Sequence, residues 1–172
     1  MVGADASTSK ATAYKVAAES STPTSLAPTA GWADGWFNAV DISSAQMIVL
    51  GGVTNPESVE LPYAYMIDLA GSNFTPVDLI SYGPGVLHSV KFSSATTALF
   101  AGCQMSSKQS KETPLLVKGV MDQAAVKTMT VTGLPTHGCL YSLYSDKNNF
   151  YLAGGTAGGA GFSRSWLLES TK

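Results

Sequence analysis

Charged residues are scarce in this chain of 172 residues, since Lys, Arg, Asp and Glu together make up only 13%, about half the usual share in soluble domains. The ten Lys and Arg residues are spread along the chain, and the formal net charge is −2. Binding to nucleic-acid phosphates needs clustered basic side chains. No apolar stretch approaches the roughly 20 residues that span a bilayer. We therefore expect neither a nucleic-acid partner nor a membrane span.

Residues with catalytic or metal-binding chemistry are also few. The chain has two cysteines, Cys103 and Cys139, and two histidines, His88 and His137, which are far apart in sequence. It has no Gly-x-Ser-x-Gly nucleophile elbow, and no Gly-Lys-Ser/Thr follows the glycine-rich run 154–161, as a phosphate loop would require. These absences predict a protein that is not an enzyme, with no catalytic residue, no cofactor and no metal site.

The N-terminal residues 1–12 are small and polar and lack the basic and apolar regions of a signal peptide. They indicate a flexible lead-in with nothing to bury. The sequon Asn73-Phe74-Thr75 makes Asn73 a candidate glycosylation site in an exposed turn. Together with the uncharged, Ser- and Thr-rich composition, this sequon favours a secreted or cell-surface protein.

A repeat organises the rest of the chain. Three segments align, beginning at Gly35, Gly85 and Gly138, and their spacings are 50 and 53 residues. Each segment has an apolar run, a polar turn and a second apolar run that ends at glycine, which is typical of a β-hairpin. The runs are too short for helices. They predict two strands, a and b, in each repeat.

Two further strands are expected in most repeats. Apolar runs at 63–68, 114–119 and 165–169 are candidates for strand c, and runs at 74–80 and 127–134 are candidates for strand d. Four strands that recur every 50 residues or so match the radial repetition of a β-propeller, whose blades are small twisted sheets.

The phase of the repeat suggests that the chain starts and stops inside a blade. Residues 14–16 fit strand c and 24–26 fit strand d, whereas 166–169 supply only a strand c at the end. The predicted fold is an all-β partial propeller over 13–172, with about three four-stranded antiparallel blades and an incomplete ring. Its blade segments are 13–34, 35–84, 85–137 and 138–172.

The glycine pairs and aromatics resemble the kelch repeat. Gly51-Gly52 is followed by Tyr65 and Phe74, Gly154-Gly155 is followed by Trp166, and His88-Ser89-Val90 resembles the family's His-Ser-Ala/Val stretch. The sequence departs from the pattern at Gly102-Cys103 and where Phe74 replaces Trp. The resemblance implies a kelch-like, galactose-oxidase-like propeller. The copper enzymes of that fold need His and Tyr ligands, with one Tyr cross-linked to Cys, and we find no such constellation.

The glycines at the ends of the b strands are expected to be structural, because close backbone approach leaves no room for a Cβ there. They are Gly51, Gly52, Gly102, Gly154 and Gly155. The large aromatics are expected to pack between blades. They are Trp36, Phe37, Tyr65, Phe74, Phe92, Phe100, Phe150 and Trp166. Cys103 follows one b strand and Cys139 opens the next a strand, on the same face of a propeller. They can form a disulfide or remain two buried thiols.

A non-catalytic scaffold for protein–protein interaction is the leading functional hypothesis. Its rim would be formed by the loops 53–61 and 104–113, since loops on rigid scaffolds commonly carry function. An open arc needs a protein partner, a second copy or further chain to complete the ring. If a second copy supplies the missing arc, its acidic half would dock the basic half of the first, because the charges sum to −6 up to residue 80 and to +4 from Lys91 onward.

Two alternatives stay open. A carbohydrate-binding or carbohydrate-active propeller of a secreted or surface protein would use exposed aromatics such as Trp32 and Trp36. A purely structural set of blades inside a larger assembly would need no site.

Overall fold

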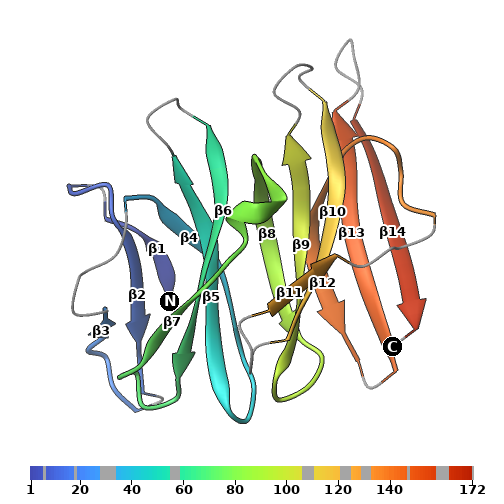
Figure 1. Ribbon diagram of the computed structural model, residues 1–172. Helices are drawn as coiled ribbons and strands as arrows, with labels where there is room; N and C mark the ends of the chain where they lie inside the picture. Colours follow the sequence, from blue (N-terminus) through green and yellow to red (C-terminus); the bar gives the residue numbers. More distant parts are fainter. Residues whose placement is uncertain are drawn as a thin grey trace.

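The chain is all-β and folds into four small antiparallel sheets that stand face to face in a row (Figure 1). The computed structural model describes residues 1–5, 7–17, 19–27, 34–54, 59–105, 111–120, 125–128, 133–146, 148–157 and 163–171. Over these residues the row is open and does not close into a ring.

The first two sheets contain three and four strands. The first sheet has the order β1-β2-β3 and consists of β1 (Val2–Ala4), β2 (Ala11–Lys15) and β3 (Thr24–Leu26). The second sheet has the order β4-β5-β6-β7 and consists of β4 (Trp36–Ile42), β5 (Gln46–Thr54), β6 (Glu60–Asp68) and β7 (Phe74–Val77).

A short 3-10 helix, η1 (Ile80–Tyr82), leads to the third sheet. That sheet consists of β8 (Gly85–Phe92), β9 (Thr97–Met105), β10 (Glu112–Val120) and β11 (Ala125–Thr128). The fourth sheet consists of β12 (Cys139–Ser145), β13 (Asn149–Ala157) and β14 (Ser163–Thr171). No helix of the described residues is long and apolar enough to cross a membrane.

The second, third and fourth sheets fall within the segments 35–84, 85–137 and 138–172 of the repeat. Their strands pair in the order in which they occur in the chain, because short polar turns join neighbouring antiparallel strands. The strand expected at 127–134 instead covers Ala125–Thr128, where it pairs with the end of β10. The residues 129–132 of that expectation lie outside the described residues.

The expectation of a flexible lead-in over 1–12 is wrong. Val2 pairs with Ala13 and Ala4 pairs with Ala11, and these two partner alanines are 2% and 1% exposed. The small, polar composition of residues 1–12 did not indicate a strand, because a three-residue edge strand such as β1 can form without a large apolar residue. The N-terminus therefore supplies a strand b, and the strand order is bcd, abcd, abcd, abc.

The core lies between the sheets rather than inside any one of them. Successive strand residues point to opposite faces, so Ile48 and Leu50 pack against the third sheet while Val49 packs against the first. The third and fourth sheets meet in the same way through Leu99 and Leu152. The aromatics Phe37, Phe100 and Phe150 are buried between sheets, as the sequence predicts. The side chain of Trp166 lies outside the described part of the chain.

Candidate functional site

Three edge strands, β4, β8 and β12, lie next to one another along one side of the row. Each has a β-bulge at the same position of the repeat, where the register shifts around Asn38, His88 and Tyr141. A bulge inserts one unpaired residue and redirects its side chain, and bulges are enriched near functional sites. The repeat thus displays three different polar side chains at equivalent places.

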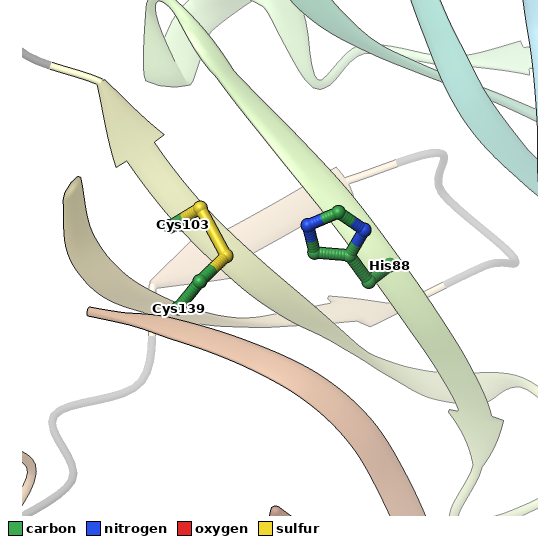
Figure 2. Close-up of side chains that lie close together, drawn as sticks. All are labelled: His88, Cys103 and Cys139. Carbon is green, nitrogen blue, oxygen red and sulfur yellow. A yellow bond between two sulfur atoms is a disulfide. The ribbon is translucent and has the colours of Figure 1, made fainter. Parts of the chain in front are cut away.

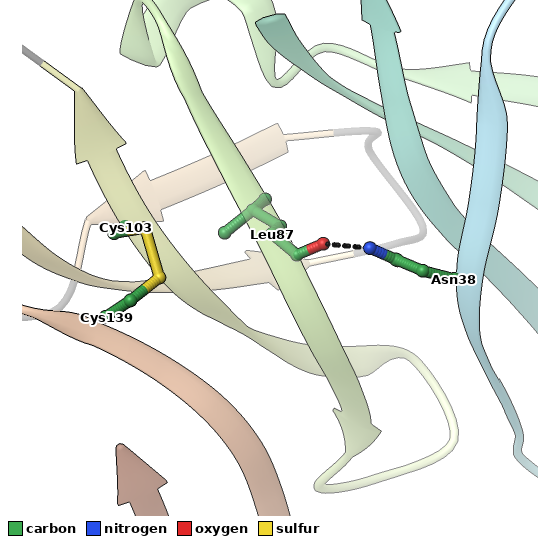
Figure 3. Close-up of a disulfide and its surroundings, with 4 residues drawn as sticks. All are labelled: Asn38, Leu87, Cys103 and Cys139. Carbon is green, nitrogen blue, oxygen red and sulfur yellow. Dashed lines mark hydrogen bonds between the residues drawn. A yellow bond between two sulfur atoms is a disulfide. The ribbon is translucent and has the colours of Figure 1, made fainter. Parts of the chain in front are cut away.

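The bulge residues contact the neighbouring sheet. Asn38 Nδ2 donates a hydrogen bond to the backbone oxygen of Leu87, at 3.2 Å, across the gap between the second and third sheets (Figure 3). The rings of His88 and Tyr141 lie 5.2 Å apart, between the third and fourth sheets. The bulges therefore form a polar row that crosses three sheets.

Cys103 and Cys139 form a disulfide that joins the end of β9 to the start of β12 (Figure 3). Their Cα atoms are 4.7 Å apart, and the two residues are 2% and 0% exposed. Cys103 pairs with Val86 near the start of β8, and Cys139 occupies the corresponding first position of the next a strand. Of the two states that the sequence left open, the structure contains the disulfide.

His88 lies beside this disulfide (Figure 2). A ring nitrogen of His88 and the sulfurs of Cys103 and Cys139 all lie within 4.8 Å of one another. Burial lowers the pKa of the half-buried His88, and the carboxylates of Glu112 and Glu60 act in the opposite direction. The imidazole is therefore favoured in its neutral form, with a nitrogen lone pair available.

Sequence reasoning did not bring these three residues together. It compared His88 with His137, which is exposed and is not a member of the cluster. The alignment of the repeat could have predicted the proximity of His88 and Cys139. His88 is the fourth residue of one segment, and Cys139 is the second residue of the next. Neighbouring sheets place these positions close together.

Steric contacts explain why the repeat has glycine at the ends of its b strands. A Cβ on Gly51 would collide with the backbone oxygen of Trp36, and one on Gly102 would collide with that of Val86, because the bulged a strand crosses closely over strand b. A Cβ on Gly52 would lie 2.7 Å from Cζ2 of Trp36. Gly154 and Gly155 pair with Leu140 and Cys139 at the corresponding place in the fourth sheet.

Asn73 lies in the exposed turn between β6 and β7, as its sequon predicts. Its Nδ2 donates to Oδ2 of Asp68 at 2.6 Å. Asp68 also accepts from the backbone N–H and the hydroxyl of Ser72, and these hydrogen bonds hold its pKa well below its usual range. Glycosylation of Asn73 stays a prediction.

The other sequence-derived candidates are only partly described. Residues 55–58 and 106–110 of the two expected rim loops, the glycine-rich stretch 158–161 and Trp32 lie outside the described residues. Trp36 is half-buried, and its ring fills the space beside Gly52, which does not favour a sugar-stacking role.

These features define an all-β protein of repeated antiparallel sheets with a disulfide and a histidine at the junction of the third and fourth sheets. Comparisons with protein-family models, with curated proteins and with solved structures returned no match. The geometry of the repeat and of its exposed faces is therefore the basis for a functional assignment.

Proposed function

We propose that this chain is an arc of a kelch-like β-propeller that acts as a non-catalytic scaffold for protein–protein interaction, and that a second copy completes the ring. Repetition of one sheet unit, stacked face to face, supports a propeller because each blade covers the face of the one before it. An arc built in this way leaves one uncovered surface at each end.

The outer face of the fourth sheet carries the proposal. We define this face by Tyr144, Tyr151, Ala153 and Leu167. Tyr144 is 62% exposed and Leu167 is 70% exposed, and Leu167 pairs with Ala153 across the strands. At the positions that match Tyr151, Ala153 and Leu167 in the two preceding sheets, the side chains are 0 to 4% exposed; they are Ile48, Leu50, Ala64, Leu99, Ala101 and Leu116. The positions that match Tyr144 are Asp41 and Lys91, whose side chains are 14% and 34% exposed.

This face also carries the exposed residues Ser142, Ser165 and Glu169. Large apolar side chains exposed together on one face mark an interaction surface. Tyr is enriched at protein interfaces because its ring buries a large area while its hydroxyl keeps a polar contact. Tyr144 and Tyr151 lie with their ring centroids 6.1 Å apart on this face. A further sheet that packs on this face would bury Tyr151, Ala153 and Leu167, as neighbouring sheets bury the matching positions elsewhere in the row.

The opposite end of the row also has apolar side chains that no neighbouring sheet covers. Val40 on β4 is 39% exposed, whereas its counterparts Val90 and Leu143 are 5% and 6% exposed. Val90 packs in a cluster with Ile48 and Leu50, and Leu143 packs in a cluster with Leu99 and Ala101. The a strands β8 and β12 also lie beside the a strand of the preceding sheet, whereas the first sheet has no a strand among its described residues. Val40 and Ile42 instead line an apolar groove of about 280 Å³.

Charge favours a second copy as the occupant. The first half of the chain is acidic, with a net charge of −6 up to residue 80, and the second half is basic, with +4 from Lys91 onward. An arrangement that places the first half of one copy against the second half of the other brings regions of opposite net charge together. Electrostatic complementarity of this kind steers association and sets orientation, and two such contacts would close a two-fold ring.

Light scattering over a range of protein concentrations tests this proposal. We expect the native chain of 17.8 kDa to approach twice its monomer mass as concentration rises. Leu167→Asp should weaken this association at least tenfold, because a charge would be buried in the interface. The matched control is Ile80→Asp, since Ile80 is 52% exposed but lies on η1, away from the outer face.

A folded native chain that stays monomeric at high concentration would remove the second copy as the occupant. An equal effect of Leu167→Asp and Ile80→Asp would show that the outer face is not the contact.

A further inference from the structure

We propose that reduction of the Cys103–Cys139 disulfide turns the junction between the third and fourth sheets into a Zn²⁺ site, with both thiolates and the imidazole of His88 as ligands. This inference does not depend on the proposed function. The cluster is the one group of three His, Cys, Asp or Glu side chains in the described residues whose ligand atoms come close enough to share an ion.

The positions of the three ligand atoms fit a single zinc ion. They lie within 4.8 Å of one another, and Zn–S and Zn–N bonds measure about 2.3 Å and 2.0–2.1 Å. One central ion can therefore reach all three after the sulfurs separate, with no large movement of the backbone. A set of two Cys and one His leaves a fourth position of the tetrahedron for water, as zinc sites with three protein ligands do.

Each ligand is held by a rigid element. Cys103 on β9 and Cys139 on β12 are paired in their sheets. His88 is the bulge residue of β8, and its neighbours Leu87 and Ser89 are both paired with β9. The ring of Tyr141 contacts His88 and restricts how the imidazole can turn. Figure 2 shows the imidazole lying beside the two sulfurs.

Charge balance favours zinc at this depth. The cysteines are 2% and 0% exposed, and two uncompensated thiolates would be costly at such buried positions. Zn²⁺ bound to two thiolates and a neutral imidazole carries no net charge. Thiolate and imidazole ligands also suit zinc better than Mg²⁺ or Ca²⁺, which prefer oxygen ligands.

The chemical steps balance with a dithiol as the reductant. The dithiol transfers two electrons and two protons to the disulfide, so the Cys103–Cys139 bond breaks, two thiols form and the dithiol is oxidised to its own disulfide. Zn²⁺ then displaces the two thiol protons into solvent as the Zn–S bonds form. Oxidation by the reverse route releases the ion.

The experiment uses the full chain, reduced with a dithiol, freed of the reductant under anaerobic conditions and dialysed against Zn²⁺ alone. We expect one Zn²⁺ per reduced chain and none per disulfide-bonded chain. His88→Gln should weaken binding by more than the roughly 10–100-fold that loss of an outer-shell partner costs. His137→Gln, which removes the other histidine, should bind like the native chain.

Co²⁺ in place of Zn²⁺ gives a second readout, because thiolate ligation produces a charge-transfer absorption band. We expect this band in the reduced native chain and its loss in Cys139→Ser. Failure of the reduced chain to bind Zn²⁺, equal affinity of His88→Gln and the native chain, or loss of the β-sheet circular dichroism on reduction would each overturn the inference. None of these outcomes depends on whether two copies associate.

Discussion

Gly3 and Gly51 lie at corresponding positions of two b strands but have different surroundings. Each follows a residue whose strand partner is a buried alanine, Ala13 or Ala64. A Cβ on Gly51 would meet the backbone oxygen of Trp36, whereas a Cβ on Gly3 has only Thr12 Oγ1 nearby, at 3.8 Å. The difference arises because strand a crosses over Gly51, and no a strand precedes β1 in the first sheet as described.

Gly51→Ala should therefore destabilise the fold strongly, and Gly3→Ala should not. The backbone of the bulged a strand cannot move away from the new Cβ without breaking its ladder, so we expect a loss of at least about 1–3 kcal/mol. Gly3→Ala should change stability by no more than about 0.5 kcal/mol. Urea unfolding of the two variants measures the difference, and equal losses would contradict the steric account.

Much at the residue scale could be predicted from the sequence. The glycine pairs and buried aromatics follow from repeated motifs, because close backbone approach and large apolar area impose the same residue types in each repeat. The bulges could not be predicted, since a bulge depends on the register between two strands and has no characteristic amino-acid composition. The repeat alignment places His88 and Cys139 at nearby positions of neighbouring segments, whereas the bulge at His88 depends on register.

At the scale of elements, Asp41 on β4 ties the second sheet to the third. Its carboxylate accepts from Lys91 Nζ at 2.9 Å and from the backbone N–H of Phe92 at 2.7 Å. Its side chain is 14% exposed, whereas that of Lys91 is 34% exposed. Ser89 plays a similar part at the next junction, where its hydroxyl accepts from the backbone N–H of Leu143 at 3.1 Å.

Asp41→Ala should cost more stability than Lys91→Met. The first change leaves the Phe92 N–H without its acceptor, which costs about 1–3 kcal/mol. The second removes a partly exposed ion pair, for which about 0–1 kcal/mol is typical. Thermal or urea unfolding of both variants tests the order. A larger loss for Lys91→Met would show that the ion pair, and not the backbone contact, links the two sheets.

Most elements were predictable because the apolar runs are short, alternate with polar turns and recur with one period. β3 has the bounds expected for it, and the strands expected at 63–68 and 165–169 are present but longer. β1 was not predicted, since Val2, Gly3 and Ala4 bury little area and their strand character comes from pairing with β2. Local sequence carries little information about a short edge strand of this kind.

At the scale of the whole molecule, the two ends of the row determine the functional proposal. The outer face of the fourth sheet and the groove beside Val40 are the places where the repeat leaves apolar side chains uncovered. The phase of the repeat could indicate that the first and fourth sheets have fewer strands than the others, but it could not identify which side chains are left exposed. That depends on which face of each strand turns toward its neighbour, and a shift of one residue in register reverses it.

Hydroxyl-radical footprinting at low and high protein concentration tests the central claim most directly, because it measures the solvent accessibility of individual side chains. We predict that the reactivity of Tyr144 and Leu167, which are 62% and 70% exposed in the single chain, falls at high concentration. Ile80, which is 52% exposed and lies on η1 away from the outer face, should keep its reactivity. Unchanged reactivity of Tyr144 and Leu167 at every concentration would contradict the claim that a second copy covers the outer face.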